Sequence, residues 1–276
     1  MTWLWTCQPA TPLRALVTGA SSGIGRALAT ELAGRGFSMV VSGRREEALR
    51  TLAQTIEKEY GVVCLPYPGD LTAADVRQGL LAEAEVKLGG LDLLVNNAGC
   101  GAIGCVEEID DEAARRLIDL NFLAPVSLTR GALPLLRRSA AARKRGHRRV
   151  LPAVIFVSSI VGLVGTPYYG VYGAAKGAIR LFADSLRAEV AGDGIGVLSV
   201  MPGTTETPFF DHLVTSGRRP RLPKHRALSP QTVARRIVRA LCQGRHRLLT
   251  HPESRWLAHL DRFCPSLIDW VMKHCG

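Results

Sequence analysis

The 276-residue sequence contains no apolar run close to the roughly 18 residues that a helix needs to cross a bilayer. Its first residues lack the basic stretch that opens a secretory signal, so no signal peptide is expected. These two absences predict a cytoplasmic protein. Peripheral contact with a membrane surface stays open as an addition.

The sequence also lacks a Cys-x-x-Cys pair. Its seven cysteines are scattered and odd in number, so neither a disulfide framework nor a zinc site is indicated. A reducing compartment is the simplest interpretation, and no metal is expected.

Acidic residues are too few to balance the basic ones, and the net charge is +11 at pH 7. Such a charge raises nucleic acid, an anionic membrane and acidic proteins as partners. No aromatic RNA-binding signature and no recognition-helix motif is present, so nucleic acid is not expected. The charge is concentrated in residues 137–149 and 218–226. Such runs are usually solvated surface, and a membrane or acidic partner bound through 137–149 is the alternative.

Segments rich in Val, Leu and Ile alternate with segments of helical periodicity along the chain. We predict strands at 13–18, 37–42, 62–67, 91–96, 153–158, 195–201 and 247–250. We predict helices at 24–35, 46–59, 73–87, 110–136, 172–190 and 230–242. This alternation is typical of βαβ units. It predicts an α/β fold of the Rossmann type: a doubly wound, mostly parallel seven-stranded sheet with helices on both faces.

No shift in composition marks a second domain, so residues 1–276 are expected to form one domain. Residues 1–12 would be an N-terminal extension, and 203–229 a Gly/Pro/Arg-rich loop over the substrate. Residues 251–276 have apolar residues at helical spacing; we expect this tail to pack on the core, with a membrane-facing amphipathic helix as the alternative. The basic segment 137–149 resembles an insertion, and it should emerge at the sheet edge opposite the carboxyl ends.

The stretch TGASSGIG, residues 18–25, lies between the first predicted strand and the first predicted helix. A glycine loop in this position presents backbone N–H groups and a helix N-terminus to the pyrophosphate of a dinucleotide. The predicted contact residues are Gly19, Ser21, Ser22, Gly23, Ile24 and Gly25.

The end of the second predicted strand selects the cofactor. An acidic residue there would bind the ribose 2′-hydroxyl of NAD, but the sequence is SGRREE, residues 42–47. The Arg44 guanidinium can hold the 2′-phosphate of NADP through charge-assisted hydrogen bonds. NADP is therefore predicted over NAD, and the alternative is that Arg44 and Arg45 simply begin the next helix.

Three tyrosines lie in YYGVYGAAKG, residues 168–177, and Tyr172 alone has a lysine four residues later. On a helix this spacing puts Tyr172 and Lys176 on one face. A free phenol has a pKa of about 10, so a catalytic tyrosine needs a neighbouring cation.

Taken in order, these motifs resemble the short-chain dehydrogenase/reductase family in its ordinary-length, single-domain form. The resemblance covers about residues 13–210 and includes the N-N-A-G motif at 96–99 and Pro202-Gly203. Ser159 also fits, because it precedes Tyr172 by thirteen residues.

The resemblance implies an NADP-dependent oxidoreductase that moves a hydride between NADP(H) and a carbonyl or secondary alcohol. Tyr172 would be the acid or base, and Lys176 would bind the nicotinamide ribose and lower the phenol pKa. Ser159 would hydrogen-bond the substrate oxygen, and Asn121 would hold a water in a proton relay. Asn121 as a merely structural residue is the alternative.

The resemblance also implies further cofactor contacts beyond the glycine loop. These are Asp70, Leu71, Asn97, Ala98, Gly99, Pro202, Gly203, Thr205 and Thr207. Thr205 stands where the family often has an apolar residue, which puts its backbone contact to the carboxamide in doubt.

Aromatic residues near the motifs are expected to line the substrate pocket: Tyr168, Tyr169, Phe209 and Phe210. They suit a moderately hydrophobic lipid, steroid or xenobiotic ketone, while the basic residues of 218–226 suit an acidic group. Simple packing is the alternative for the two tyrosines. Relatives commonly pair two long helices, here 110–136 and 172–190, so a homo-oligomer is expected. Two other functions stay open on this fold: a non-catalytic NADP-binding regulator, and a membrane- or partner-docking protein.

Overall fold

The computed structural model describes residues 13–146, 152–209, 214–215 and 227–251, and beyond them positions 256, 263, 264, 266, 267 and 270. The predicted N-terminal extension and Phe210 lie outside the described residues. So do most of the predicted tail, 251–276, and all of the basic stretch 218–226.

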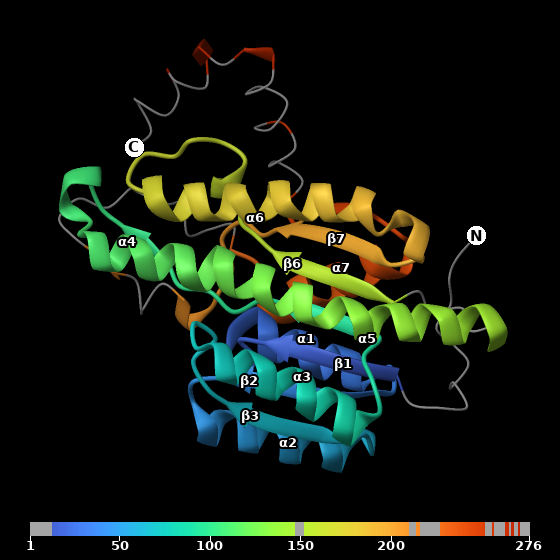
Figure 1. Ribbon diagram of the computed structural model, residues 1–276. Helices are drawn as coiled ribbons and strands as arrows, with labels where there is room; N and C mark the ends of the chain where they lie inside the picture. The colour runs from blue at the N-terminus through green and yellow to red at the C-terminus, as the bar shows by residue number, and fades with distance from the viewer. Residues whose placement is uncertain are drawn as a thin grey trace.

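Seven parallel strands form the central sheet in the order β3-β2-β1-β4-β6-β7-β9 (Figure 1). They are β1 (Leu13–Thr18), β2 (Phe37–Gly43), β3 (Cys64–Pro68), β4 (Leu93–Asn96), β6 (Ala153–Val157), β7 (Gly196–Met201) and β9 (Arg247–Leu249). The predicted Rossmann-type sheet is confirmed. The chain winds outward from β1 to β3 and then returns to place β4 on the other side of β1. That reversal is the point where open α/β sheets bind ligands.

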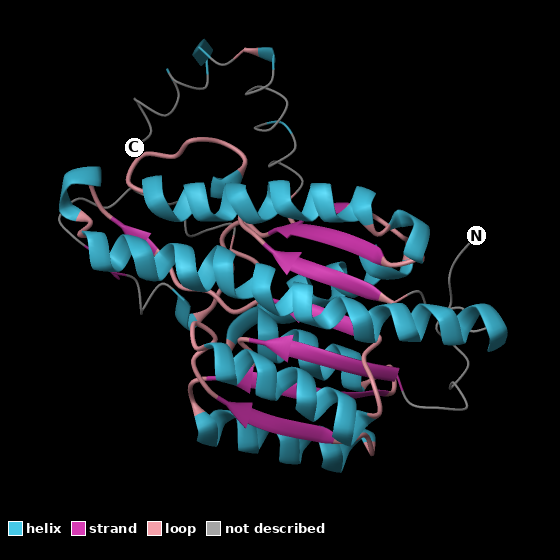
Figure 2. Cartoon of the chain, viewed as in Figure 1, coloured by secondary structure: helices cyan, strands magenta, loops and turns pink. Residues whose placement is uncertain are grey.

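Helices cover both faces of the sheet (Figure 2). They are α1 (Gly23–Ala33), α2 (Glu46–Tyr60), α3 (Ala74–Leu88), α4 (Asp111–Ile118), α5 (Ala124–Gly146), α6 (Gly170–Glu189) and α7 (Pro230–Cys242). Residues of α1, α2 and α7 share one buried apolar cluster, and those of α3, α5 and α6 share a second. The sheet is therefore the middle of three layers.

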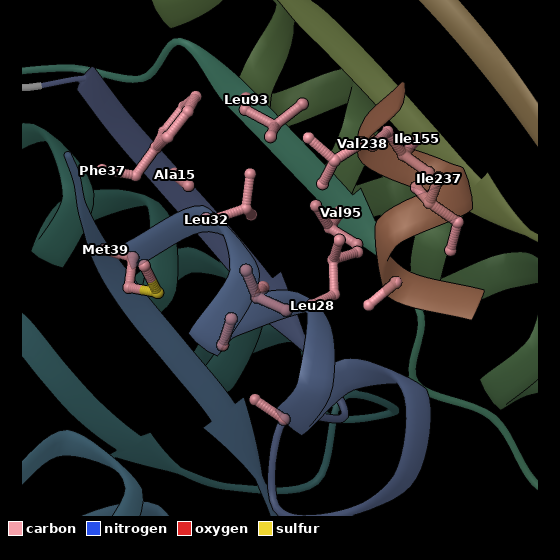
Figure 3. Packing of buried hydrophobic residues seen from close by; sticks show 14 of the residues in the cluster. Ala15, Leu28, Leu32, Phe37, Met39, Leu93, Val95, Ile155, Ile237 and Val238 are labelled. Atoms are coloured by element: carbon pink, nitrogen blue, oxygen red, sulfur yellow. The ribbon is translucent and has the colours of Figure 1, made fainter. Parts of the chain in front are cut away.

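Strands β1, β2, β4, β6 and β7 each contribute to both clusters, because successive side chains point to opposite faces. In β1, Ala15 and Val17 join the first cluster and Leu16 joins the second. Figure 3 shows the first cluster, where Leu28 of α1 and Ile237 of α7 lie against the strands.

The long predicted helix at 110–136 differs in the structure. It is divided into α4, a π-helical turn at Asp119–Leu123, and α5. The described part of the basic segment 137–149 belongs to α5, which extends past the predicted end at 136 and runs on through Gly146. Residues 137–145, RRSAAARKR, are mostly strong helix formers, so nothing in them ends the helix.

This extension of α5 lies where the strands begin (Figure 1). Arg137 pairs with Asp193 at 2.7 Å, and Arg138 pairs with Glu85. These two arginines are therefore engaged by the protein's own carboxylates. Of the helices in the described part of the chain, none has both the length and the apolarity to cross a bilayer.

A second, two-stranded parallel sheet was not predicted. It pairs β5 (Ala102–Ile103) with β8 (Val214–Thr215). Two residues are too few to give a strand its alternating pattern in the sequence. The pairing ties the predicted substrate loop to the segment that follows β4.

Asp92, directly before β4, is the centre of a buried polar cluster at the amino edge of the sheet. It accepts hydrogen bonds from the Arg14 guanidinium and backbone and from the Ser139 hydroxyl. Burial opposes ionisation of Asp92, but these bonds outweigh it and hold the pKa below its ordinary value. The cluster fixes α5 and β1 to the start of β4.

We expect Asp92→Asn to lower the free energy of unfolding by about 3 kcal/mol at pH 7, because it leaves Arg14 without its buried partner. The depressed pKa stabilises the fold only where the carboxylate is ionised. The difference in unfolding free energy between wild type and Asp92→Asn should therefore be complete above the ordinary carboxyl pKa of about 4. It should be lost as the pH falls through the lowered pKa of Asp92 in the folded state.

Urea unfolding at pH 7 and pH 3 measures this difference. The matched control is Asp193→Asn at the surface pair with Arg137, which should cost less than about 1 kcal/mol. Equal effects of the two substitutions would contradict the prediction.

Candidate active site

A cavity of about 640 Å³ opens where the parallel strands end. It is lined by the loops that follow β1, β2, β3, β4, β6 and β7, and it lies at the reversal of strand order between β1 and β4. All motifs that the sequence brings forward contribute to this one region.

The glycine loop is fastened to the N-N-A-G segment beside it. The Asn97 side-chain amide donates to the carbonyls of Thr18 at 2.9 Å and Gly19 at 3.2 Å. The Thr18 hydroxyl accepts from the backbone N–H groups of Asn97 at 3.0 Å and Ala98 at 3.1 Å. Gly19 has φ +67°, and a Cβ there would lie 2.8 Å from Ala98 Cα. Only glycine allows this turn and this approach.

The N-terminus of α1 faces the cavity. Ser22 precedes the helix, its side chain makes no capping hydrogen bond, and the first turn holds no acidic residue. The helix N–H groups and dipole are therefore open to a pyrophosphate, so the loop fits a dinucleotide.

The predicted cofactor residues nearly all line the cavity. Those that do are Gly19, Ser21, Ser22, Gly23, Ile24, Arg44, Asp70, Leu71, Asn97, Ala98, Gly99, Tyr172, Lys176, Pro202, Gly203, Thr205 and Thr207. Gly25 does not: it is buried beneath the loop, where a Cβ would meet the Gly19 carbonyl. Its role is close packing of helix against loop.

Two arginines follow β2 at one end of the cavity. Arg45 folds back onto the glycine loop and donates to the Ser21 carbonyl at 3.1 Å. Arg44 is exposed and lines the cavity. A Cβ on Gly43 would lie 3.1 Å from Ser21 Oγ, so strand end and loop are in close contact. Arg45 also lines the cavity, although the sequence analysis predicted a cofactor contact only for its neighbour Arg44.

Asp70 lies at the same end, after β3. Its pKa is lowered, first by the hydrogen bond from the Thr72 backbone and further by the positive charges of Arg116 and Arg44. Arg116 approaches its carboxylate at 3.6 Å. The carboxylate therefore stays ionised at neutral pH and can accept hydrogen bonds there.

Tyr172 and Lys176 lie on the same face of α6, as predicted from their spacing. They are 8% and 4% exposed, and Lys176 Nζ is 5.8 Å from the centre of the Tyr172 ring. Nζ donates to the Val157 carbonyl at 3.0 Å. The Ser159 side chain, just beyond β6, hydrogen-bonds Tyr172. The structure thus brings Ser159, Tyr172 and Lys176 together.

Burial dominates the ionisation of this group. It raises the pKa of Tyr172, and the hydrogen bond with Ser159 offsets this only in part. Burial lowers the pKa of Lys176 to about 8. The net shift is opposite to the expected one: the pKa of the Tyr172 phenol is raised, because burial outweighs the interactions that favour its ionised form.

Asn121 lies one layer behind the cavity, in the π-helical turn. Its side-chain nitrogen donates to the carbonyls of Cys100 and Leu117, both at 2.9 Å. Its Oδ1 is buried and makes no hydrogen bond within the described part of the chain. A Cβ on Gly99 would lie 2.6 Å from this oxygen and 3.2 Å from Lys176 Nζ, so both atoms flank Gly99. A π-turn often marks a functional position.

Two aromatic rings flank Tyr172. The ring centres of Tyr169 and Phe209 lie 6.3 and 5.8 Å from that of Tyr172, and both residues line the cavity. Tyr168 is not among the residues that line the described cavity. Its backbone is left-handed, with φ +68°, and its carbonyl accepts from Gly104 N–H at 3.0 Å.

The loop after β7 contacts two residues, Thr250 and His251, that the sequence analysis did not predict as part of the site. The Gly203 N–H donates to Thr250 Oγ1 at 3.3 Å, and a Cβ on Gly203 would lie 2.7 Å from His251 Nδ1. Thr205 Oγ1 donates to the Gly203 carbonyl at 3.1 Å, so this hydroxyl stabilises the loop itself. No sequence pattern links Thr250 or His251 to this loop.

Other lining residues were missed because they flank the motifs without belonging to them. They are Gly43, Gly69, Cys100, Gly101, Leu120, Val157, Ser158, Ile160, Val161, Thr166, Thr204 and Pro208.

Comparison with known proteins agrees with this geometry. The family model described as short chain dehydrogenase matches residues 14–216. The chain belongs to the short-chain dehydrogenase/reductase family. It is therefore an oxidoreductase of that family, and the resemblance predicted from the motifs is confirmed.

Matches to individual relatives and solved structures extend over most of this chain. 11-beta-hydroxysteroid dehydrogenase A of Sesamum indicum is 32% identical over 269 residues, covering 94% of this chain and 74% of the relative. A short-chain dehydrogenase from Sphingobium yanoikuyae in complex with NADPH is 27% identical with a TM-score of 0.75, covering 93% and 95% of the two chains. One from Burkholderia phymatum in complex with NAD has a TM-score of 0.81 over 95% and 96% of the two chains. It is 22% identical and shows the fold alone.

We expect Lys176→Met to raise the free energy of unfolding at pH 7, because the native state keeps an ammonium group away from water. A pKa lowered from 10.5 to about 8 corresponds to about 3 kcal/mol. Between these pKa values the unfolded chain binds more protons than the native state, so wild-type stability should rise with pH there. The Lys176→Met variant should lack this rise.

Urea unfolding at pH 7 and pH 9.5 measures both effects. Lys87→Met, at an exposed position of α3, is the control and should change little. A destabilised Lys176→Met variant at pH 7 would contradict the prediction.

Proposed function

We propose that this short-chain dehydrogenase/reductase transfers a hydride between NADP(H) and a carbonyl or secondary alcohol of a moderately hydrophobic substrate. One observation carries the proposal. A buried tyrosine, Tyr172, lines the cavity, is hydrogen-bonded by Ser159 and has Lys176 beneath its ring. This is the arrangement that protonation of a carbonyl oxygen requires.

In the direction of reduction, Ser159 donates a hydrogen bond to the substrate carbonyl and stabilises the charge that develops on its oxygen. NADPH, when bound, supplies the hydride to the carbonyl carbon. Tyr172 gives its phenolic proton to the oxygen, and the product is an alcohol. Its raised pKa keeps Tyr172 protonated through neutral pH, which is the form that reduction needs.

Lys176 and Asn121 assist the proton transfer from Tyr172. Below a pH of about 8 Lys176 carries a positive charge close to Tyr172, and that charge favours loss of the phenolic proton. The Asn121 oxygen, which has no hydrogen-bond partner among the described residues, lies beside Gly99 on the same side as Lys176 Nζ. We assign it to a water-mediated path that returns a proton to the site.

The proposed cofactor preference is argued from the two arginines that follow β2, Arg44 and Arg45. Arg44 lines the cavity and Arg45 is hydrogen-bonded to Ser21, so two guanidinium groups adjoin the glycine loop. Neither β2 nor the turn after it offers an acidic residue before Glu46 to bind a ribose 2′-hydroxyl. A 2′-phosphate matches this charge, and NADP is proposed over NAD.

The substrate class is proposed from a small apolar cluster around Tyr172. Ala102, Ile103, Leu117 and Tyr169 belong to this cluster, with Phe209 packed against it. Of these residues, Tyr169 and Phe209 line the cavity and give it apolar walls. Such walls favour a hydrophobic ketone. The relative from Sesamum indicum is named for a hydroxysteroid, which supports the same class.

Further proposals concern the whole chain. We propose that residues 1–276 act as one unit and form a homo-oligomer through α5 and α6, where Leu181 is 60% exposed. A cytoplasmic location, and a membrane or acidic partner bound through 137–149, stay predictions. The pairing of Arg137 and Arg138 with carboxylates leaves any such contact to the remaining basic residues.

Tyr172→Phe should lower kcat/KM for NADPH-dependent carbonyl reduction by at least about 1,000-fold, because the ring stays but the transferable proton is lost. NADPH affinity should change by less than about threefold. Fluorescence titration and a ketone panel measure the two quantities. Retained reduction would refute the assignment, and loss of both would point to a structural defect. A wild-type protein that binds NADPH but reduces no ketone would favour the non-catalytic regulator.

Arg44→Ala should weaken NADPH binding by about 10–100-fold, because charge-assisted hydrogen bonds to the 2′-phosphate are lost. NADH, which lacks that phosphate, should bind within about threefold of wild type. Arg50→Ala is the matched control, because Arg50 pairs with Glu46 on α2 and does not line the cavity. Equal losses for both cofactors would contradict the prediction.

A further inference from the structure

A second tyrosine, Tyr169, faces the cavity but has no part in the reaction described above. It is 6% exposed, and its ring centre lies 6.3 Å from that of Tyr172. Burial raises its pKa to about 12, so it is a neutral hydrogen-bond donor at physiological pH. Within the described residues its hydroxyl makes no hydrogen bond.

The backbone before Tyr169 is held in a costly conformation. Tyr168 is left-handed, which is an uncommon state for a bulky residue and persists only where the surroundings impose it. Two backbone bonds impose it here: Gly104 N–H donates to the Tyr168 carbonyl at 3.0 Å, and Tyr169 N–H to the Thr166 carbonyl at 3.1 Å. The outcome is that Tyr169 lines the cavity and Tyr168 does not.

Neighbouring hydroxyls on this wall are engaged elsewhere. Ser158 donates to the Lys176 carbonyl at 2.6 Å, and Thr166 to the Val164 carbonyl at 3.1 Å. Phe209 and Val161 add apolar surface around Tyr169. An apolar ligand would leave the Tyr169 hydroxyl buried and unpaired, which costs free energy, whereas a ligand oxygen would satisfy it.

We propose that Tyr169 donates a hydrogen bond to a second oxygen of the substrate, next to the carbonyl that Tyr172 protonates. The substrate class is then a hydrophobic ketone with a neighbouring carbonyl or hydroxyl group. Tyr169 determines specificity and does not take part in proton transfer. This inference rests on the proposed function, because it uses the position of the reacting carbonyl.

The test compares two ketones on one carbon skeleton, 1-phenylpropane-1,2-dione and 1-phenylpropan-2-one. Tyr169→Phe keeps the ring and removes only the hydroxyl. We expect kcat/KM with NADPH to fall about tenfold for the dione and by at most about threefold for the monoketone. Tyr168→Phe, outside the cavity, is the matched control and should affect neither. Equal losses for both ketones would mean that Tyr169 only packs, and no loss would mean that it touches no substrate; either result overturns the inference.

A binding measurement separates this inference from the proposed reaction. Calorimetry of both ketones against the protein with NADP⁺ should show a preference for the dione that Tyr169→Phe removes. If that preference is present but neither ketone is reduced, the inference stands and the proposed reaction fails. If both are reduced and no preference depends on Tyr169, the proposed reaction stands and the inference fails.

Discussion

The cavity depends on the joint between the ends of β1 and β4. The Thr18 hydroxyl donates to the Val95 carbonyl at 3.1 Å and accepts two N–H groups of the following turn, while Asn97 bonds back to the glycine loop. The chain leaves these two strands in opposite directions, so a gap opens between their loops. Every loop that lines the cavity is placed relative to this joint.

Chemistry at this edge requires groups that folding alone would avoid. Lys176 is buried with a lowered pKa, and Tyr168 has a left-handed backbone. Asn121 keeps a buried oxygen that has no hydrogen-bond partner in the described part of the chain. Each of these raises the free energy of the native state. They occur together within the loops and helix ends around Tyr172. The large clusters on the two sheet faces offset them.

Much of this site can be predicted from the sequence because its motifs are short and local. The glycine loop joins one strand to one helix, and Tyr172 and Lys176 are one helical turn apart. Contacts set by tertiary packing could not be predicted in the same way. Thr250 and His251 meet Gly203 only because β9 pairs with β7. Gly25 matches a motif, but its packing beneath the loop excludes it from the cavity.

Strand and helix positions were also predictable, since apolar runs and helical periodicity mark them. The end of α5 is not marked in the sequence, because the Arg, Lys and Ala residues after position 136 sustain a helix. The β5–β8 pair has too few residues to leave a pattern. Burial of Tyr172 reversed the expected direction of its pKa shift, and burial cannot be read from spacing.

The polar cluster at Asp92 and the cavity lie at opposite edges of one sheet. Asp92 precedes β4, whereas Asn97 and Gly99 follow it. Substitutions that far apart, with no shared partners, generally have additive effects on stability. The fold therefore gives evolution two separate regions to vary. A change that improves packing at the amino edge can compensate for a costly new side chain at the carboxyl edge, and substrate range can drift without loss of the folded state.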